Sequence, residues 1–438
     1  MRYIERLSHA PIEFMRFLHT SDWHLGQALH NFERGYEHRC FLDWLLDTIV
    51  SEQADALLVA GDIFDNANPS AASQKQLYRF LQQARVRAPH LNIVIIAGNH
   101  DSPGRLEAPA PLLEGQGAHV IGHIERDADG QIDLDRLVIP LMDQAGAIQA
   151  WCLAIPFLRP GDVPRSAAAD EEPIDEEPID PYLAGIALLY RQTLALALAK
   201  RQPGQAILAM GHCHMVDGQV SQDSERRIVI GGTEALPTGV FDQAIAYAAL
   251  GHLHLAQRVG QKDHLRYCGS PIPLSFAEVN YQHQVLRIDL EGETVREVLS
   301  LAVPRAVELM RIPKKPAPLS EVLAALSALD LPAAQLHIQP LLEVRVRLDA
   351  PEPGLRARIE AALEGKPIRL AKIETSSAAQ QDSDRDADST LSLDQLDRLQ
   401  PDDIFRRLYL KKYGNPAPHE QLTAFAELTL PGAEKTSP

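Results

Sequence analysis

Cysteine is scarce in this sequence, and the cysteines that occur do not lie in pairs. Only four are present among 438 residues (Cys40, Cys152, Cys213 and Cys268), and no two of them form a Cys-x-x-Cys pair. Disulfide-rich secreted domains and structural zinc sites both need closely spaced cysteines. The sequence therefore predicts reduced thiols in a cytoplasmic protein and excludes a disulfide framework and a zinc knuckle.

Long apolar runs are also missing. No run reaches the roughly 18 residues from which a membrane-spanning helix is recognised. The first ten residues, MRYIERLSHA, carry charges where a secretory signal has its apolar stretch. We therefore expect neither export nor a membrane anchor.

Basic residues are outnumbered by acidic ones. The chain has 42 Lys and Arg against 59 Asp and Glu, a net charge of −17, which at first argues against nucleic acid as a partner. Much of this charge is local. Residues 170–180 hold seven acids and no base, and residues 382–388 hold four acids and one Arg, which leaves −7 for the other 420 residues. The tandem Glu-Glu-Pro-Ile-Asp within 171–180 predicts a solvated loop, and the remaining body is only mildly acidic.

Five short apolar segments each run into a polar cluster. Helical spacing of apolar residues over roughly 36–53 and 70–87 separates the first three of them. Such an alternation predicts a parallel sheet covered by helices on both faces. Because ligands bind at the carboxyl edge of open α/β sheets, we expect the clusters to share one cleft. The predicted strands are 16–20, 56–60, 93–97, 206–210 and 246–250.

The clusters supply side chains that bind divalent metal ions. Imidazole and carboxylate groups suit Mn²⁺, Zn²⁺ or Fe²⁺, and Cys213 provides the only thiol in a motif. Seven ligands are too many for one ion, but they fit two ions that share a bridging carboxylate, as in two-metal phosphoryl transfer. The candidate ligands are Asp22, His24, Asp62, Asn99, His212, His252 and His254, with His100 beside Asn99.

From about residue 303 the pattern changes to that of a small, separate α+β domain. Residues 375–389 are rich in Ser, Asp and Gln and predict a disordered linker. A helix that begins at Pro401 carries an apolar stripe with Ile404 and Leu408, which either docks on a partner or folds back on the protein's own body. The predicted elements of the small domain are strands 307–312, 342–348 and 368–373 and helices 319–329 and 354–364.

Taken together, the motifs resemble the signature of the calcineurin-like metallophosphoesterases. Three longer segments, HTSDWHLG (19–26), GDIFD (61–65) and RYCGSPIPLSF (266–276), are similar within that superfamily to the SbcD family of bacterial nuclease subunits. The motifs are Asp22-x-His24, Gly61-Asp62, Gly98-Asn99-His100-Asp101, Gly211-His212 and Gly251-His252-x-His254.

The resemblance implies an α/β fold, a four-layer α-β-β-α sandwich with a small capping domain and C-terminal partner-binding helices. Residues 1–14 precede the usual start of the family, at Met15, and are interpreted as an extension or a misassigned start. The implied domains are a nuclease domain (15–302), an α+β capping domain (303–374), a disordered linker (375–392) and a helical ATPase-binding segment (393–438).

The same resemblance implies how the site residues act. Asp22, His24, Asp62 and His254 would hold one Mn²⁺, Asp62 would bridge, and His100 would stabilise or protonate the leaving oxygen. The second Mn²⁺ would be held by Asp62, Asn99, His212 and His252.

The activity implied is cleavage of DNA ends and hairpins, as a 3′–5′ exonuclease on duplex and an endonuclease on single strands, in DNA repair, recombination and replication. The implied partner is SbcC, an ATPase with long coiled coils. The implied assembly is a homodimer of nuclease subunits within a heterotetramer, located in the cytoplasm at the nucleoid.

Two positions need separate interpretation. Archaeal and eukaryotic relatives have a histidine three residues after the Gly-Asp aspartate, where this chain has Asp65, as bacterial members do. His214 follows His212 as a second histidine. We assign the ligand to His212 because it directly follows Gly211 at the strand end, and we interpret His214 as a loop histidine.

Contacts to DNA are less evident in the sequence. The candidates for phosphate contact, each of which is also compatible with an ordinary solvated surface, are Arg105, Arg126, Arg159, Lys314 and Lys315. Two other functions stay open: a phosphoesterase of the same fold that acts on nucleotides or phosphoproteins, and a non-catalytic scaffold. The intact ligand set argues against the scaffold.

Overall fold

The computed structural model describes residues 14–164, 180–216, 218–219, 235–348, 350, 352–376, 409 and 418. The predictions for 1–13, for nearly all of the acidic stretch 170–180 and for nearly all of 377–438 lie outside these residues. The described residues up to 346, together with 354–374, belong to one compact unit, which contains every element described below except the strand ends at 347 and 375–376.

The first sheet has six strands in the order β14-β13-β1-β4-β5-β6. Strands β1, β4, β5 and β6 are parallel, whereas β13 pairs antiparallel with β1 and with β14. The bounds are β1 Met15–Thr20, β4 Ala56–Ala60, β5 Asn92–Ile96, β6 Ala118–Ile121, β13 Gln284–Glu291 and β14 Thr294–Ala302.

The second sheet also has six strands, in the order β11-β12-β10-β9-β8-β7. Its central strands β12, β10, β9 and β8 are parallel, and the edge strands β11 and β7 are antiparallel to their neighbours. The bounds are β7 Val138–Met142, β8 Ile148–Ala154, β9 Ala206–His212, β10 Tyr247–Gly251, β11 Gln257–Val259 and β12 Lys262–Tyr267.

The main hydrophobic core lies between these two sheets. Along β4, Leu58 and Ala60 belong to this core, while Leu57 and Val59 belong to a second core under helices α1 and α2. The alternation follows from the period of two in a strand, which points successive side chains to opposite faces. Because both faces are covered, the strand is apolar throughout.

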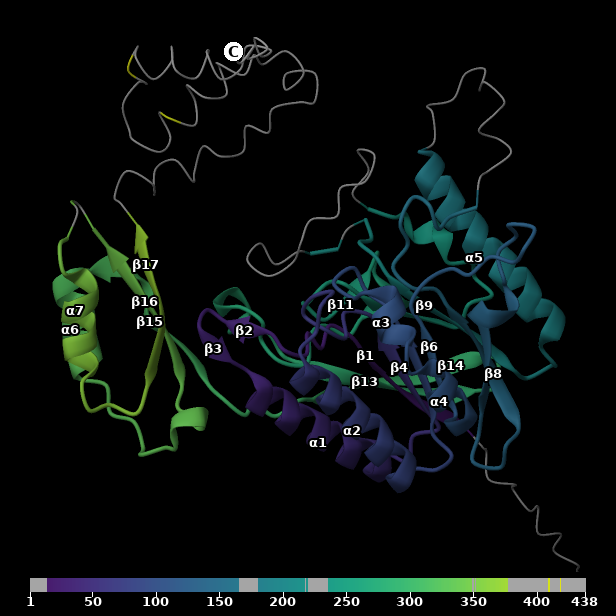
Figure 1. Cartoon of the computed structure of the whole chain (residues 1–438), viewed down its shortest axis with the longest axis horizontal. Helices are drawn as coiled ribbons and strands as arrows, with labels where there is room; N and C mark the ends of the chain where they lie inside the picture. Colours follow the sequence, from purple (N-terminus) through teal and green to yellow (C-terminus); the bar gives the residue numbers. More distant parts are fainter. Residues whose placement is uncertain are drawn as a thin grey trace, which may run out of the picture. The chain divides into compact units, whose positions relative to one another are not determined.

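Helices cover the outer faces of both sheets and complete four layers (Figure 1). Helices α1 (Gly35–Ser51) and α2 (Ala71–Arg87) pack on the first sheet, and α5 (Pro181–Lys200) packs on the second. Short elements complete this part. They are β2 Ala28–Leu29, β3 Phe32–Glu33, α3 Pro103–Glu107 and α4 Ala110–Leu113.

Among the described residues, α5 is the one helix that is long and apolar enough to cross a membrane by length and composition. Its buried residues include Ile186, Leu189, Tyr190 and Leu194, spaced three and four apart, and they contact the core of the second sheet. Such a stripe is typical of a helix that covers a sheet, and we interpret α5 in this way.

A smaller sheet of three strands, in the order β15-β16-β17, carries α6 and α7 on one side (Figure 1). Strand β15 runs past the predicted end at residue 312 through Pro313, Pro316 and Pro318. An edge strand tolerates proline because one of its sides makes no ladder hydrogen bonds. The bounds are β15 Leu309–Pro318, α6 Leu319–Ser327, β16 Leu341–Arg347, α7 Leu355–Leu363 and β17 Arg369–Ser376.

The prediction of a single parallel sheet from the apolar pattern is wrong. Strands β1, β4 and β5 belong to the first sheet, and β9 and β10 belong to the second. A strand between a helix layer and another sheet is buried on both faces, as is a strand between two helix layers, so the pattern cannot distinguish them. The α-β-β-α sandwich implied by the family resemblance is confirmed.

Candidate metal centre

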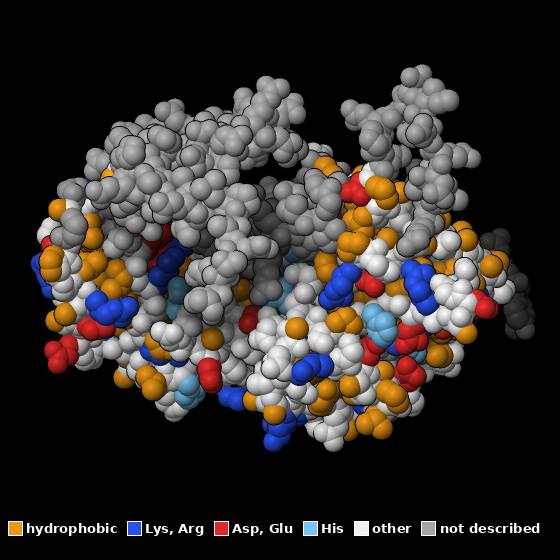
Figure 2. Space-filling view, turned by 45° about the horizontal axis from the view of Figure 1, so that its top comes forward, with side chains coloured by type: hydrophobic (Ala, Val, Ile, Leu, Met, Phe, Trp, Pro, Cys, Tyr) orange, Lys and Arg blue, Asp and Glu red, His pale blue; other side chains and the backbone are white. Residues whose placement is uncertain are grey.

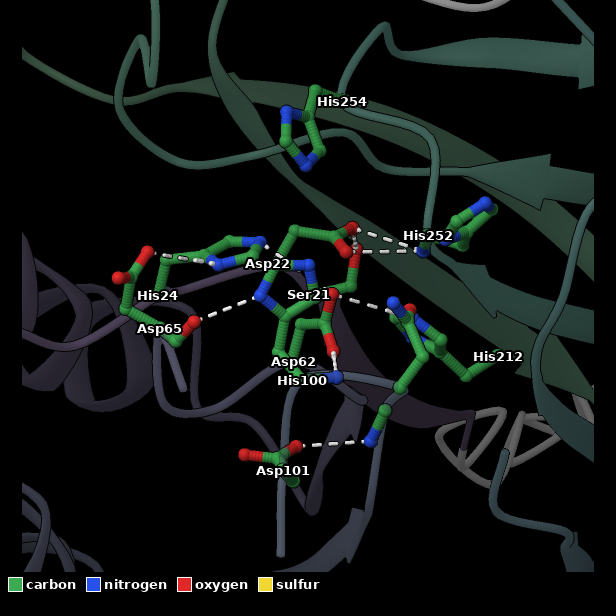
Figure 3. A network of polar contacts seen from close by, with 12 residues as sticks. Ser21, Asp22, His24, Asp62, Asp65, His100, Asp101, His212, His252 and His254 are labelled. Carbon is green, nitrogen blue, oxygen red and sulfur yellow. Dashed lines mark hydrogen bonds and ion pairs between the residues drawn. The ribbon is translucent and has the colours of Figure 1, made fainter. Parts of the chain in front are cut away.

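The polar clusters meet where strands of the two sheets end. Asp22 follows β1, Asp62 follows β4 and Asn99 follows β5, while His212 ends β9 and His252 follows β10. Figure 3 shows the side chains converging from both sheets on one small volume. All candidate ligands except the half-buried Asn99 are buried. The predicted convergence of the strand ends on one place is therefore confirmed, although two sheets contribute to it.

Four candidate ligands have an unusual backbone conformation. The φ angles are +53° at Asp22, +46° at His24, +49° at Asp62 and +103° at His252. Positive φ is rare for residues with a side chain and costs free energy. The surrounding fold therefore holds these turns in conformations that direct the side chains inward.

The glycines of the motifs allow the turns to approach each other closely. A Cβ atom on Gly98 would lie 2.1 Å from Asp62 Oδ1, and one on Gly61 would lie 2.2 Å from His212 Nδ1. A Cβ atom on Gly251 would lie 1.8 Å from the carbonyl oxygen of Ala60. A larger residue at these positions would push apart the turns that carry the candidate ligands.

Asp62 occupies the middle of the site. Its Oδ2 atom lies 3.5 Å from His24 Nε2 and 3.5 Å from His212 Nε2. Its Oδ1 atom accepts a hydrogen bond of 2.9 Å from the backbone N–H of His100. One carboxylate thus faces imidazoles on two sides.

Side chains that could share a metal ion form three groups around Asp62. Within each group, one potential ligand atom per residue lies within 4.8 Å of the others. Asn99 is adjacent, with Oδ1 at 2.9 Å from His212 Nε2. The groups are Asp22, His24 and His254; His24, Asp62 and His100; and Asp22, Asp62 and His212.

His252 is in none of these groups. Its backbone N–H donates to Asp22 Oδ1 at 3.0 Å. Its ring packs against the rings of His212 and His214, with centroids 5.4 and 6.3 Å away. The second histidine, His214, thus contacts the site through a ring, and the structure places both histidines of the 212–214 pair near His252.

The rings of two candidate ligands are oriented by a hydrogen bond at Nδ1. His212 Nδ1 lies 2.9 Å from the carbonyl oxygen of Ala60, which can only accept, so Nδ1 carries the proton and Nε2 faces Asp62. His254 Nδ1 lies 2.9 Å from Oε1 of Glu278. Metal-binding histidines commonly donate their second ring nitrogen in this way.

The electrostatics of the site favour a positive charge beside Asp62. Burial would raise the pKa of the Asp62 carboxyl, but the His212 imidazole outweighs it and holds that pKa well below its usual range. Burial would lower the pKa of His212, but the Asp62 carboxylate raises it to about 9. Burial raises the pKa of Asp22 and lowers that of His252.

The donor set fits divalent cations. His24 Nε2 is buried and has no hydrogen-bond partner among the described residues, although it lies 3.5 Å from Asp62 Oδ2. An orphaned buried nitrogen costs free energy unless something binds it, and nitrogen and oxygen donors without thiolate suit Mn²⁺ or a similar ion. These side chains could therefore hold metal ions.

His100 and Asp65 lie at one side of the centre. His100 Nδ1 is 2.8 Å from the backbone oxygen of Asp65, which fixes the ring, and the His100 ring stands 4.8 Å from the His24 ring between centroids. The Asp65 carboxylate lies 3.6 Å from His24 Nδ1. Asp65 thus contacts the candidate ligand His24 at the ring nitrogen that does not face Asp62.

Sequence reasoning missed two buried carboxylates. Asp101 accepts hydrogen bonds of 2.9–3.1 Å from the backbone N–H groups of Ile63, Phe64 and Gly98, which join two of the turns. Asp101 is the last residue of the Gly98-Asn99-His100-Asp101 motif, so the sequence shows the residue but not the hydrogen bonds that it accepts. Glu278, by contrast, lies two residues beyond the 266–276 segment and has no local signal.

Comparison with known proteins places the chain in a family. The model of the calcineurin-like phosphoesterase family matches residues 15–256, more than half of the chain. The SbcD subunit of the SbcCD nuclease from Rhodobacter capsulatus is 44% identical over 361 residues, which are 82% of this chain and 86% of that protein. The chain belongs to the SbcD family of calcineurin-like phosphoesterases.

Further relatives and a second domain model agree with membership in the SbcD family. The SbcD subunit of the SbcCD nuclease from Escherichia coli is 34% identical over 83% of this chain and 85% of its own length. The SbcD subunit from Bacillus subtilis is 34% identical over 65% of this chain and 69% of its own length. Residues 305–413 match a model described as the type 5 capsule protein repressor C-terminal domain. The crystal structure of a dimetal phosphatase from Danio rerio aligns with 66% of this chain and 99% of its own at 14% identity, with a TM-score of 0.35.

The candidate DNA contacts of this SbcD-family chain differ in their surroundings. The Arg126 guanidinium donates to the backbone oxygens of residues 130, 162 and 163, so it holds a loop together. Arg159 stacks over Phe157 at 5.5 Å, and Phe157 contacts the His212 ring at 6.4 Å. Arg105 bonds Asn68 at the surface, and Lys314 and Lys315 are exposed on β15.

Proposed function

We propose that this chain is the nuclease subunit of an SbcCD-type complex and hydrolyses phosphodiester bonds at DNA ends and hairpins with two Mn²⁺ ions. One observation carries the proposal: a single Asp62 oxygen lies 3.5 Å from imidazole nitrogens on two sides. A carboxylate with imidazoles on two sides is placed where it could bridge two ions of a two-metal phosphoryl-transfer site. The relatives that are named as SbcD subunits of the SbcCD nuclease support DNA as the substrate.

We assign the ligands as the family resemblance implies. One ion would be held by Asp22, His24, Asp62 and His254. The other would be held by Asp62, Asn99, His212 and His252. When bound, two such ions would polarise a phosphoryl oxygen and provide a nucleophile from water at neutral pH.

In this proposal, His100 transfers a proton to the leaving oxygen. Because its Nδ1 is hydrogen bonded to the Asp65 carbonyl oxygen at 2.8 Å, the proton that it transfers would be at Nε2. Histidine is the side chain that most often protonates a leaving group as a general acid. His100 would therefore act on the leaving group and not as a ligand.

The role of His100 can be tested by the His100→Ala substitution. We expect full Mn²⁺ occupancy and DNA binding with at least ~100-fold slower cleavage, since general acid catalysis contributes about 10²–10⁴-fold. Metal content, DNA binding and cleavage of hairpin and blunt duplexes would be measured, with exposed His337→Ala as the control. Cleavage at the wild-type rate would remove His100 from the mechanism.

The substrate class is tested by assays with Mn²⁺ against Mg²⁺, with and without an SbcC-type ATPase and ATP. We expect cleavage of DNA ends and hairpins, stimulated by the ATPase, from a homodimer of this chain inside a heterotetramer in the cytoplasm. Hydrolysis of nucleotides or phosphoproteins with none of DNA would favour another phosphoesterase activity. Absence of any hydrolysis with both metals bound would favour a scaffold.

A further inference from the structure

Glu278 is a carboxylate buried completely behind the candidate metal centre. It ends the short helix η5 (Phe276–Glu278) and has an exposed fraction of 0%. Both of its oxygens are engaged: Oε1 lies 2.9 Å from His254 Nδ1, and Oε2 accepts the backbone N–H of Leu274 at 2.7 Å. A buried carboxylate with both oxygens used has one well-defined orientation.

This contact decides which nitrogen of His254 faces the site. A carboxylate accepts hydrogen bonds, so the proton lies on Nδ1 and the lone pair lies on Nε2. His254 also belongs to the group with Asp22 and His24, and its ring stands 5.3 Å from the His24 ring. Nε2 is therefore the atom of His254 that can bind a metal ion.

We propose that Glu278 is a positioning residue for one metal site: it fixes the tautomer and the ring orientation of His254. The inference rests on the proposed function, because it presumes that His254 binds metal. A carboxylate that accepts a hydrogen bond from a metal-binding histidine makes that histidine more basic. Removing the carboxylate typically weakens metal affinity about 10–100-fold. The effect should be confined to the ion that His254 holds.

The position of Glu278 depends on packing outside the two large sheets. Ser275 Oγ accepts the N–H of Ala277 at 3.2 Å and starts η5. Phe276 packs in a cluster with Val307 and Leu309, and Arg305 donates to the backbone oxygen of Val279 at 3.1 Å. The segment that orients His254 is thus fixed by residues that lead into the three-stranded sheet.

The alternative is that Glu278 only contributes to folding. Glu343 offers a matched control, because it is also 0% exposed and its carboxylate pairs with Arg311 at 2.5 Å and with Lys372 at 3.0 Å in the small sheet. If burial of a paired carboxylate were the whole effect, Glu278→Gln and Glu343→Gln would both destabilise the chain and would both leave metal binding unchanged.

The test is calorimetric titration of the full chain with Mn²⁺, together with urea unfolding of the metal-free protein. We expect two sites in the wild type, a 10–100-fold loss at one of them in Glu278→Gln, and wild-type affinities in Glu343→Gln. If Glu278→Gln does not fold, Glu278→Asp keeps the charge on a shorter side chain, and we expect a loss at the same single site. Equal Mn²⁺ affinities in the wild type and the Glu278 variant would overturn the inference.

A double-mutant cycle shows whether Glu278 acts through His254. In the His254→Ala background, Glu278→Gln should cause no further loss of Mn²⁺ affinity. A loss as large as in the wild type would overturn the inference, since Glu278 would then act elsewhere. These titrations need no cleavage, so a chain that binds two Mn²⁺ ions but leaves DNA intact would overturn the proposed function alone.

Discussion

At the scale of single residues, the candidate metal centre concentrates backbone conformations that are rare for residues with a side chain. Four of the seven non-glycine residues with positive φ in the described part of the chain are candidate ligands. Each such residue costs about 1–3 kcal/mol. Burial of the flanking strands can offset this cost, and the strands before Asp62 and His252 are buried at every residue.

The close approach of the turns leads to a prediction for Gly251→Ala. A Cβ atom there would lie 1.8 Å from the carbonyl oxygen of Ala60 and 2.9 Å from His212 Nδ1. We expect a loss of about 1–3 kcal/mol in the free energy of unfolding, as for other overpacked sites, together with weaker Mn²⁺ binding. Urea unfolding and metal titration measure both effects.

Gly104→Ala is the control for this prediction, because a Cβ atom on Gly104 meets nothing within 4 Å. The control should keep the wild-type stability or gain a little, since alanine favours helix. Equal stability of the two variants would contradict the steric argument.

The candidate ligands could be picked out because each stands in a short motif at a strand end, whereas the side chains that contact them could not. His254 is recognisable from Gly251-His252-x-His254, but Glu278 is 24 positions away and reaches it only through the fold. The spacing also could not show that His252 belongs to none of the groups around Asp62. Sequence motifs identify residues whose role is local, and they miss those whose role depends on a distant partner.

At the scale of elements, a hydrogen-bonded histidine links the two sheets beneath the site. His19 on β1 is fully buried, with Nδ1 3.0 Å from the Tyr247 hydroxyl and Nε2 3.2 Å from the backbone oxygen of Leu250, both on β10. The carbonyl oxygen can only accept, so Nε2 donates and Nδ1 accepts from the hydroxyl. Burial lowers the pKa of His19 to about 3.

This low pKa predicts a loss of stability in acid. His19 has an ordinary pKa near 6.5 when unfolded, so the unfolded chain binds its proton first, and stability falls as the pH decreases from about 6.5 towards 3. Between pH 7 and pH 5, His19 alone should cost about 2 kcal/mol. His19→Gln, which has no charge to gain, should remove that part of the slope.

Urea unfolding at pH 7 and pH 5 measures the difference. His337→Gln, at an exposed histidine, should keep the wild-type slope. If His19→Gln loses as much stability as the wild type between the two pH values, His19 is not the group that titrates.

The five strands and two helices predicted for the two large sheets are present, but strands β6–β8 and β11–β14 and helix α5 were not predicted. Strand β4 has the predicted bounds of 56–60, and α2 begins and ends within one residue of the prediction. The division of the strands between two sheets was not visible in the pattern, because β4 and β9 have equally apolar sequences. Sheet membership depends on contacts between residues far apart in the sequence, such as the pairing of Tyr247 with Leu208 or the contact of His212 with Ala60.

At the scale of the whole molecule, the charges of the described residues are mixed on the face shown in Figure 2. Basic and acidic side chains are interspersed there, so that face offers no basic patch for DNA. With a net charge of −17, the chain should attract DNA chiefly through its metal ions and through a partner. Binding that depends on few cations still weakens as salt increases.

The last prediction concerns the segment 393–438, which lies almost entirely outside the described residues. Every candidate ligand lies between residues 22 and 254, and the residues that support the centre end at Arg305 and β15. Deleting 393–438 should therefore leave Mn²⁺ binding and metal-dependent nicking of DNA unchanged.

If the apolar stripe that begins at Ile404 docks on a partner, the same deletion should abolish binding to an SbcC-type ATPase, as measured by co-purification. A full-length chain with Leu408→Asp, which places a charge on that stripe, should behave in the same way, while Arg407→Ala on the same segment should retain the partner. A truncated chain that still co-purifies with the ATPase would show that the docking surface lies elsewhere, and loss of nicking would show that the segment folds back on the body and supports the centre.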